Sequence, residues 1–145
     1  MTTTHTARTE GHPTRETAVF AHPDHTLVRV RGDLDIATAP VLREQLIAAL
    51  RPRTGPLILD LSGVSFCDAA GLAVLIGIQR RAVARGIVML LAAPGPRLSA
   101  LLELTGLDRG LSVHQTVTDA RVWSRTHTDV IRHQPHRVSS AIPAR

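Results

Sequence analysis

The sequence contains no lysine and no tyrosine, and all 17 of its basic residues are arginine. The lack of lysine excludes a Walker A phosphate loop, a Schiff-base enzyme and a lysine general base. With one tryptophan and two phenylalanines, the core must be built from aliphatic side chains. A chain of 145 residues is the length of one domain and is long enough to bury such a core.

Cysteine is nearly absent as well. Cys67 stands alone, which excludes a disulfide framework and a cysteine metal site. The longest apolar run, residues 69–78, is much shorter than the roughly 20 residues of a membrane span. The first residues also lack the pattern of a signal peptide. These features predict a cytoplasmic protein with no membrane insertion.

The net charge of +5 is divided between the central segment and its flanks. Residues 18–123 carry only a small excess of arginine, and the flanking segments carry the rest. No basic face with interleaved aromatic residues is present, so direct nucleic-acid binding is not expected.

The hydrophobic pattern predicts one α/β domain. Residues 1–17 are rich in threonine without periodicity and are expected to form a disordered arm; residues 18–125 form the domain, and residues 126–145 a flexible tail. Strand-like and helix-like segments alternate, which predicts a mixed, mostly parallel sheet of four to five strands with about four helices. Strands are expected at 18–21, 26–31, 57–59, 87–91 and 111–114. Helices are expected to begin at caps formed by Thr38 and Asp68, to run around Leu98 up to a stop at Gly106, and to extend from Thr116 or Thr118 to Arg125. In the second strand, Leu27, Arg29 and Arg31 are expected on the more exposed side.

The stretch from Leu57 to Gly77 organises the chain. A buried strand is expected to end in a turn at 60–63 and to lead through a short loop to a helix that begins at Asp68. The Asp68 carboxylate can accept hydrogen bonds from the free N–H groups of Ala70 or Gly71. The small residues 69–71 would let a ligand or partner approach the backbone.

These residues resemble the signature of the STAS domain family, the anti-sigma factor antagonists. The matching segments are 59–62 (LDLS), 66–68 (FCD), Gly71-Leu72, 32–39 (GDLDIATA) and 104–107 (LTGL). They cover roughly residues 18–123. The family's phosphoacceptor serine position is occupied by Ala70, with Ala69 beside it, so the resemblance implies no phosphorylation at that site.

The resemblance implies a non-enzymatic protein without cofactors that binds an anti-sigma factor of the serine-kinase type and releases its sigma factor. A STAS subunit of a larger signalling or lipid-transport assembly is the alternative, and a homodimer stays open. A small hydrolase or nucleotide-binding enzyme has little support, because no phosphate loop or nucleophile motif is visible. The expected partner-binding residues are Asp33, Asp35, Thr38, Asp68, Ala69, Ala70, Gly71, Val74 and Ile78.

Several of these residues have simpler interpretations. Asp68 could be an acid or a metal ligand, but a helix cap explains it better, and Cys67 is better explained as a packed thiol than as a nucleophile. Asp33 and Asp35 fit turn chemistry and a partner surface equally well. The spacing of His127, His133 and His136 is loosely metal-like, but solvated side chains are the favoured interpretation.

The faces of the helix after Asp68 were assigned from its periodicity. Leu72, Leu75, Ile76 and Val83 predict the buried face. Val74 and Ile78 would then lie on roughly the opposite side, forming a docking stripe with Ala73 and Gly77, unless a tail or loop covers them.

Overall fold

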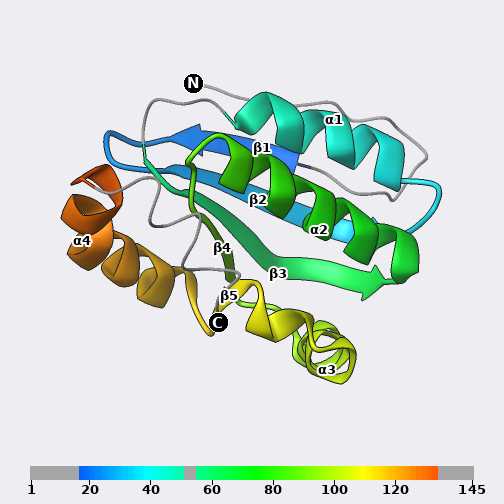
Figure 1. Cartoon of the computed structure of the whole chain (residues 1–145). Helices are drawn as coiled ribbons and strands as arrows, with labels where there is room; N and C mark the ends of the chain where they lie inside the picture. Colours follow the sequence, from blue (N-terminus) through cyan, green and yellow to red (C-terminus); the bar gives the residue numbers. More distant parts are fainter. Residues whose placement is uncertain (1–16, 51–54, 134–145) are drawn as a thin grey trace.

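The computed structural model describes the backbone of residues 17–50 and 55–133, with side chains to residue 127 (Figure 1). The predicted arm before Thr17 and the end of the tail therefore lie outside the described residues. The elements in chain order are β1 (Thr17–Ala21), β2 (Thr26–Leu34), α1 (Ala39–Ala49), β3 (Leu57–Cys67), α2 (Ala69–Ala84), β4 (Met89–Ala92), α3 (Pro96–Thr105), the 3-10 helix η1 (Leu107–Arg109), β5 (Ser112–His114) and α4 (Val117–His133).

The described strands form one five-stranded sheet in the order β1-β2-β3-β4-β5. β1 and β2 form an antiparallel hairpin, and every other neighbouring pair is parallel. Parallel neighbours require crossover connections, which the helices after β2, β3 and β4 supply. The predicted fold class, a mixed and mostly parallel sheet with about four helices, is confirmed.

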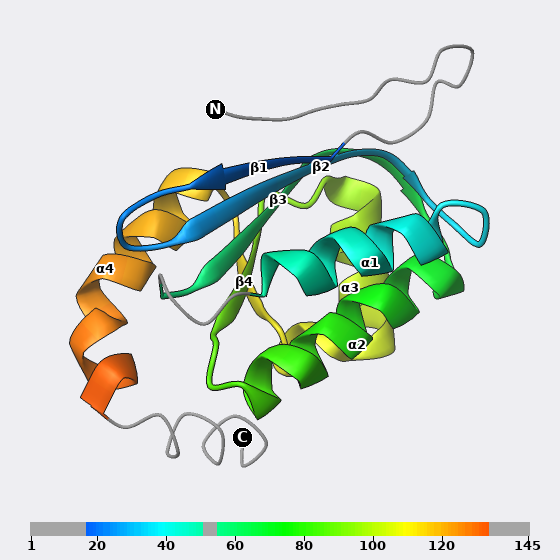
Figure 2. The same ribbon diagram turned by 90° about the horizontal axis from the view of Figure 1, so that it is seen from above.

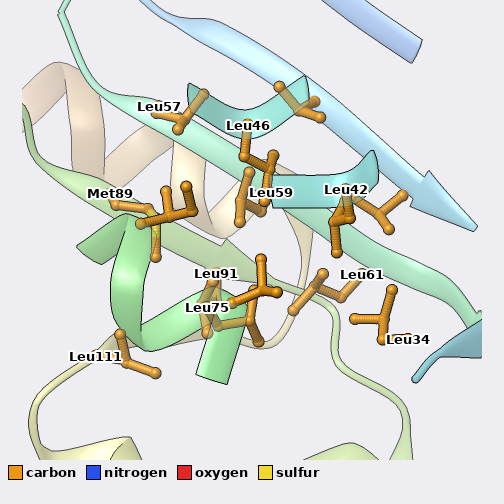
Figure 3. Close-up of a cluster of buried hydrophobic side chains, with 14 of the residues drawn as sticks. Leu34, Leu42, Leu46, Leu57, Leu59, Leu61, Leu75, Met89, Leu91 and Leu111 are labelled. Atoms are coloured by element: carbon orange, nitrogen blue, oxygen red, sulfur yellow. The ribbon is translucent and has the colours of Figure 1, made fainter. Parts of the chain in front are cut away.

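One face of the sheet is covered by α1 and α2 (Figure 2). Side chains alternate along a strand, so every second residue of β2, β3 and β4 enters the same aliphatic cluster. Figure 3 shows this cluster around leucines of the two helices and of the central strand, including Leu42, Leu46, Leu59 and Leu75. Two leucines of α3, Leu98 and Leu102, belong to it as well.

The other face carries a smaller cluster that α4 covers. Leu27 and Ile58 of the sheet are buried there with Ala120, and Val117 and Trp123 pack against them. The expectation that Leu27 is exposed is therefore wrong, because α4 covers its end of the sheet. Arg29 and Arg31 on the same strand are exposed, as expected.

The central strand is much longer than predicted. β3 continues through the presumed turn at 60–63 to Cys67, and β2 continues through Gly32 and Asp33 to Leu34. The two strands stay paired with register shifts between Arg29 and Arg31 and between Gly32 and Asp33. The polar and glycine residues that indicated a turn instead mark an irregular, twisted part of the ladder, as bulges do.

The helix α2 buries a wider face than its periodicity suggested, and that face is turned: Ile76 and Val83, which were predicted to be buried, are only half-buried. Its buried residues are Gly71, Leu72, Val74, Leu75, Ile78 and Ala82. Val74 and Ile78 are each 1% exposed and belong to the main cluster, so the predicted docking stripe is wrong. The reason is tertiary: α2 packs on the sheet and beside α1 at once, which buries more than one narrow stripe.

The last helix is also longer than predicted. Thr116 caps α4 by accepting a hydrogen bond from the Asp119 N–H at 2.9 Å, which decides between the two threonines considered. α4 then continues past the expected end at Arg125 to His133. Both views place it at the end of the sheet where the β1–β2 turn lies (Figures 1 and 2).

Candidate binding surface

The carboxyl ends of β2 and β3 lie side by side at one end of the sheet, where Leu34 pairs with Cys67. The loop to α1 leaves β2 there, and Asp68 leads β3 into α2 at the same place. Figures 1 and 2 show these strand ends on the side of the molecule opposite to the β1–β2 turn and α4. The first residues of α2 and the 35–38 loop are thus brought together by the sheet.

Asp68 caps α2 as the sequence predicts. Its Oδ1 accepts hydrogen bonds from the backbone N–H groups of Ala70 at 2.8 Å and Gly71 at 3.2 Å. Its own N–H donates to the carbonyl of Leu34 at 3.1 Å, which ties the start of the helix to the end of β2. The carboxylate is committed to the helix end, where a negative charge also complements the helix dipole.

Gly71 faces the sheet and not the solvent. A Cβ at this position would lie 2.5 Å from the Leu34 carbonyl oxygen and 2.9 Å from the Cys67 Sγ. The missing side chain lets α2 approach β2 closely, so Gly71 positions the surface without being exposed on it. The expectation that a partner approaches the backbone at Gly71 is therefore wrong.

The 35–38 loop is held by its own side chains. Asp35 Oδ1 accepts from the N–H groups of Ala37 and Thr38, both at 3.0 Å. The Thr38 hydroxyl accepts from the Asp35 N–H at 3.0 Å and donates to the Asp33 carbonyl at 2.8 Å. Thr38 stands at the N-cap position but makes no side-chain cap bond to α1, contrary to the prediction, because its hydroxyl is used inside the loop.

Apolar side chains are exposed around this loop. Ile36 at its tip is 78% exposed, and Phe66 near the end of β3 is 46% exposed. Val41 on the first turn of α1 is 51% exposed, and Ala69 opens α2 as an exposed residue. Ile36, Phe66 and Val41 were not among the residues predicted to form a binding surface. A lone apolar residue inside a polar turn, such as Ile36 between Asp35 and Ala37, is the signal that could have identified the first of them.

Ala70, at the position of the family's phosphoacceptor, is half-buried and contacts the main cluster. It is not the fully exposed residue that the first-turn position suggested. Ala73, one turn after Ala69, is exposed. The outer side of the first two turns of α2 is therefore lined by Ala69 and Ala73, with Ala70 at its border.

The surface offers little for catalysis. Burial, with a smaller contribution from the Asp68 charge, raises the pKa of Cys67 to about 11, so the thiol stays protonated at neutral pH. Burial also opposes ionisation of Asp60, but hydrogen bonds from the Ser62 N–H and hydroxyl and the nearby Arg29 outweigh it and lower its pKa. Asp60 is thus a structural carboxylate, and Cys67 fits the packed thiol that we expected.

Among the described residues, no group of three or more His, Cys, Asp or Glu side chains is arranged to hold a metal ion. Of the three tail histidines, His127 stacks on Trp123 with ring centroids 4.0 Å apart. The interpretation of His127 as a solvated residue is therefore wrong. The side chains of His133 and His136 lie outside the described part.

Curated relatives of this chain are antagonists of anti-sigma factors. The anti-sigma-B factor antagonist of Bacillus subtilis is 35% identical over 80 residues, which are 55% of this chain and 72% of the relative. The protein of the same name from Staphylococcus epidermidis is 28% identical over 96 residues, 66% of this chain and 89% of the relative. Their names describe a role that is non-catalytic, in agreement with the expectation that the chain is not an enzyme.

Solved structures agree with the fold. An anti-sigma factor antagonist from Mycobacterium paratuberculosis superimposes with a TM-score of 0.69 at 28% identity, over 77% of this chain and 95% of that one. The murine anion transporter Slc26a9 contains a similar fold at 22% identity, with a TM-score of 0.66 over 72% of this chain and 18% of that one. In the part of the present chain that the structure describes, no helix is long and apolar enough to cross a membrane. The STAS domain model matches residues 17–120, from β1 into α4. The chain therefore belongs to the STAS domain family.

Proposed function

We propose that this protein is an anti-sigma factor antagonist that binds an anti-sigma factor of the serine-kinase type and thereby releases a sigma factor. We further propose that it binds through the loop–helix surface, defined as Asp33, Asp35, Ile36, Thr38, Phe66, Asp68, Ala69, Ala70 and Ala73. The observation that carries this proposal is the exposure of Ile36 in the loop after β2, because the end of β2 is hydrogen-bonded to the capped start of α2. Phe66 is also exposed, at the end of the neighbouring strand. The named role comes from the relatives, which share 28–35% identity with the chain.

The physical character of this surface suits a protein partner. Its two large apolar side chains would be desolvated on binding, and such residues dominate the energetics of interfaces. The alanines beside them let a partner approach the helix. Asp33 is exposed on the rim, whereas Asp35 and Thr38 hold the loop that presents Ile36. Turn chemistry and a partner surface are therefore compatible in this loop.

Replacing Ile36 with glutamate should abolish most of the binding. A charge in a desolvated contact leaves an unpaired group, and the loss of one central residue typically costs about 2 kcal/mol or more, roughly 30-fold in affinity. Stability should change by no more than about 0.5 kcal/mol because the side chain is exposed. The measurement is affinity purification from the source organism with the native chain and the variant in parallel, followed by titration of the captured anti-sigma factor.

Val122→Glu is the matched control. Val122 is 50% exposed on α4, at the far end of the molecule, and its replacement should leave affinity unchanged. If Ile36→Glu binds as tightly as the native chain, the partner uses another surface. If a transport subunit is captured in place of an anti-sigma factor, the proposed function itself fails.

We also propose that this protein acts without the serine phosphorylation switch of its family. Alanine at position 70 has no hydroxyl to modify, and Ala69 offers none either. The hydroxyl of Ser62, in the 59–62 motif, already donates to Asp60 Oδ1 at 2.8 Å. A phosphate near the start of α2 would add about two negative charges to an otherwise largely apolar contact, so its absence leaves the surface permanently competent to bind.

Incubation of the native chain with the captured anti-sigma factor and ATP should add no phosphate, as measured by intact mass. The Ala70→Ser variant provides the comparison, because a hydroxyl at this half-buried position restores the family's acceptor at little structural cost. A phosphate on Ser62 or Ser65 of the native chain would show that the switch has moved, and would contradict constitutive binding.

A further inference from the structure

The contact between α4 and the sheet is lined by histidines at both of its margins. Its apolar centre is small, with Ala120 and Trp123 of α4 set against Leu27, Ile58 and Leu90 of the sheet. The β1–β2 turn contributes His22 and His25 on one side. β5 and α4 itself contribute His114 and His127 on the other side.

The two histidines of the turn stack on each other. Their ring centroids lie 4.4 Å apart, and their planes differ by 10°. His25 is buried, and its Nδ1 lies 2.8 Å from Asp24 Oδ1. Its Nε2 is also buried and has no hydrogen-bond partner among the described residues. A buried ring nitrogen without a partner has lost the hydrogen bond that water would supply, so the docked position of the turn carries a local cost.

α4 faces this pair with cations. Arg125 Nε lies 3.7 Å from Asp24 Oδ2, so Asp24 is shared between the turn and the helix. Burial, the neighbouring His25 and the charge of Arg121 together lower the pKa of His22, and only Asp24 opposes them. The described charged and titratable groups that face the pair are thus one carboxylate and two guanidinium groups, Arg121 and Arg125.

The opposite margin is arranged in a similar way around Trp123. His127 stacks on the indole at 4.0 Å, and its Nδ1 lies 2.8 Å from the Trp123 carbonyl oxygen. The His114 ring lies 5.9 Å from the indole, with its Nε2 at 3.0 Å from the Ser112 hydroxyl. Burial lowers the pKa of His114, and the charge of Asp119 partly offsets this effect.

We propose that α4 is an acid-released cover: protonation of His22 and of His114 detaches it from the sheet and exposes the apolar surface of Leu27, Ile58 and Leu90. Detachment separates Arg121 and Arg125 from the turn and opens the buried ring nitrogens to water. Both changes favour the protonated histidines. This inference does not depend on the partner proposed above, because it concerns the opposite end of the sheet.

The direction of the pH effect follows from the sign of the shifts. His22 and His114 have lower pKa values in the docked state than the ordinary value of 6.5. The docked state is therefore fully favoured above about pH 6.5 and loses stability as the pH falls below it. Each proton taken up on release changes the opening equilibrium by at most about tenfold per pH unit in this range, and two protons change it by at most about a hundredfold.

Hydrogen exchange of the full chain, corrected for the intrinsic effect of pH, tests the proposal. Between about pH 7.5 and about pH 5.5, amides of α4 should lose protection tenfold or more, whereas amides of α2 and β3 should keep theirs. Trp123, the only tryptophan, should show a red-shifted emission over the same range. A shift of the emission wavelength reports exposure of the indole, whereas direct quenching by the stacked His127 ring changes only the intensity.

Two variants show whether the named groups are responsible. His22→Gln with His114→Gln should flatten the pH dependence of α4 protection, and Arg121→Gln should make it shallower by removing a cation that opposes protonation. Arg97→Gln is the matched control: it removes one positive charge at an exposed position of α3 and should leave the pH dependence of α4 protection unchanged. The proposal is overturned if α4 keeps its protection at the lower pH, if α2 and α4 lose protection together, or if the histidine and Arg121 variants both retain the native dependence.

Discussion

Replacing Ile78 with aspartate is expected to unfold the domain. The side chain is 1% exposed and lies among the aliphatic residues between α2 and the sheet. An aspartate there would lose the burial of the three outer carbons of the isoleucine and place an unpaired carboxylate in an apolar site. The combined cost is on the order of 5 kcal/mol, which is comparable to the whole stability of a small domain. The measurement is urea denaturation monitored by circular dichroism, in which the variant should show no cooperative unfolding transition.

Ala73→Asp is the control for this prediction. It places the same charge on the same helix, at an exposed position five residues earlier, and should change the free energy of unfolding by no more than about 0.5 kcal/mol. A folded Ile78→Asp variant with near-native stability would mean that the assignment of the faces of α2 is wrong. The earlier interpretation of Ile78 as a contact residue would then regain its basis.

Replacing Gly71 with alanine should destabilise the domain by about 2 to 4 kcal/mol, although alanine is normally the better helix former. The new Cβ would lie 2.5 Å from the Leu34 carbonyl oxygen, and a backbone atom cannot move aside as a flexible side chain can. The start of α2 would have to separate from β2. Because Asp68 donates to that same carbonyl, the cap of the helix would be displaced too. The midpoint of urea unfolding measures the loss.

Gly77→Ala on the same helix is expected to have the opposite effect on stability. A Cβ at Gly77 meets no described atom within 4 Å, so this change should stabilise the domain by roughly 0.5 to 1 kcal/mol through the reduced entropy of the unfolded chain. Equal effects of the two substitutions would contradict the close approach of Gly71 to Leu34. A destabilised Gly71→Ala variant should also bind its partner more weakly, since Asp68 and Ala69 would move relative to the 35–38 loop.

Gly71 illustrates how the proposed binding surface is held in place. Gly71 and the Asp68 cap set the position of α2 relative to β2, and the Asp35–Thr38 bonds set the loop. None of these groups needs to contact a partner. Ile36, Phe66 and Ala69, which they present, are the residues that we expect to do so. Variants of the first group should lower both stability and affinity, whereas variants of the second should lower affinity alone.

Part of the local chemistry was predictable from the sequence alone, although the turn at 60–63 and the Thr38 cap were not predicted correctly. The alternation of strand-like and helix-like segments identified the α/β class. The Asp68 cap follows from a carboxylate placed two and three residues before the free N–H groups of Ala70 and Gly71. Gly106 ends α3 in a left-handed conformation with φ of 76°. Each of these features depends on residues within a few positions of one another. The separate motif segments between Gly32 and Leu107 indicated the family because each is a short local motif and because they occur in the order typical of that family.

Only the tertiary structure decided which faces are covered. Val74, Ile78 and Leu27 were assigned to exposed positions because periodicity describes one stripe of a helix or one side of a strand. α2 is buried by the sheet and α1 together, and Leu27 is buried by a helix that begins 90 residues later in the chain. The length of β3 was likewise decided by pairing with β2, which keeps Asp60 to Cys67 extended despite residues typical of a turn. Burial depends on what lies opposite in space, and the sequence of a single element does not contain that information.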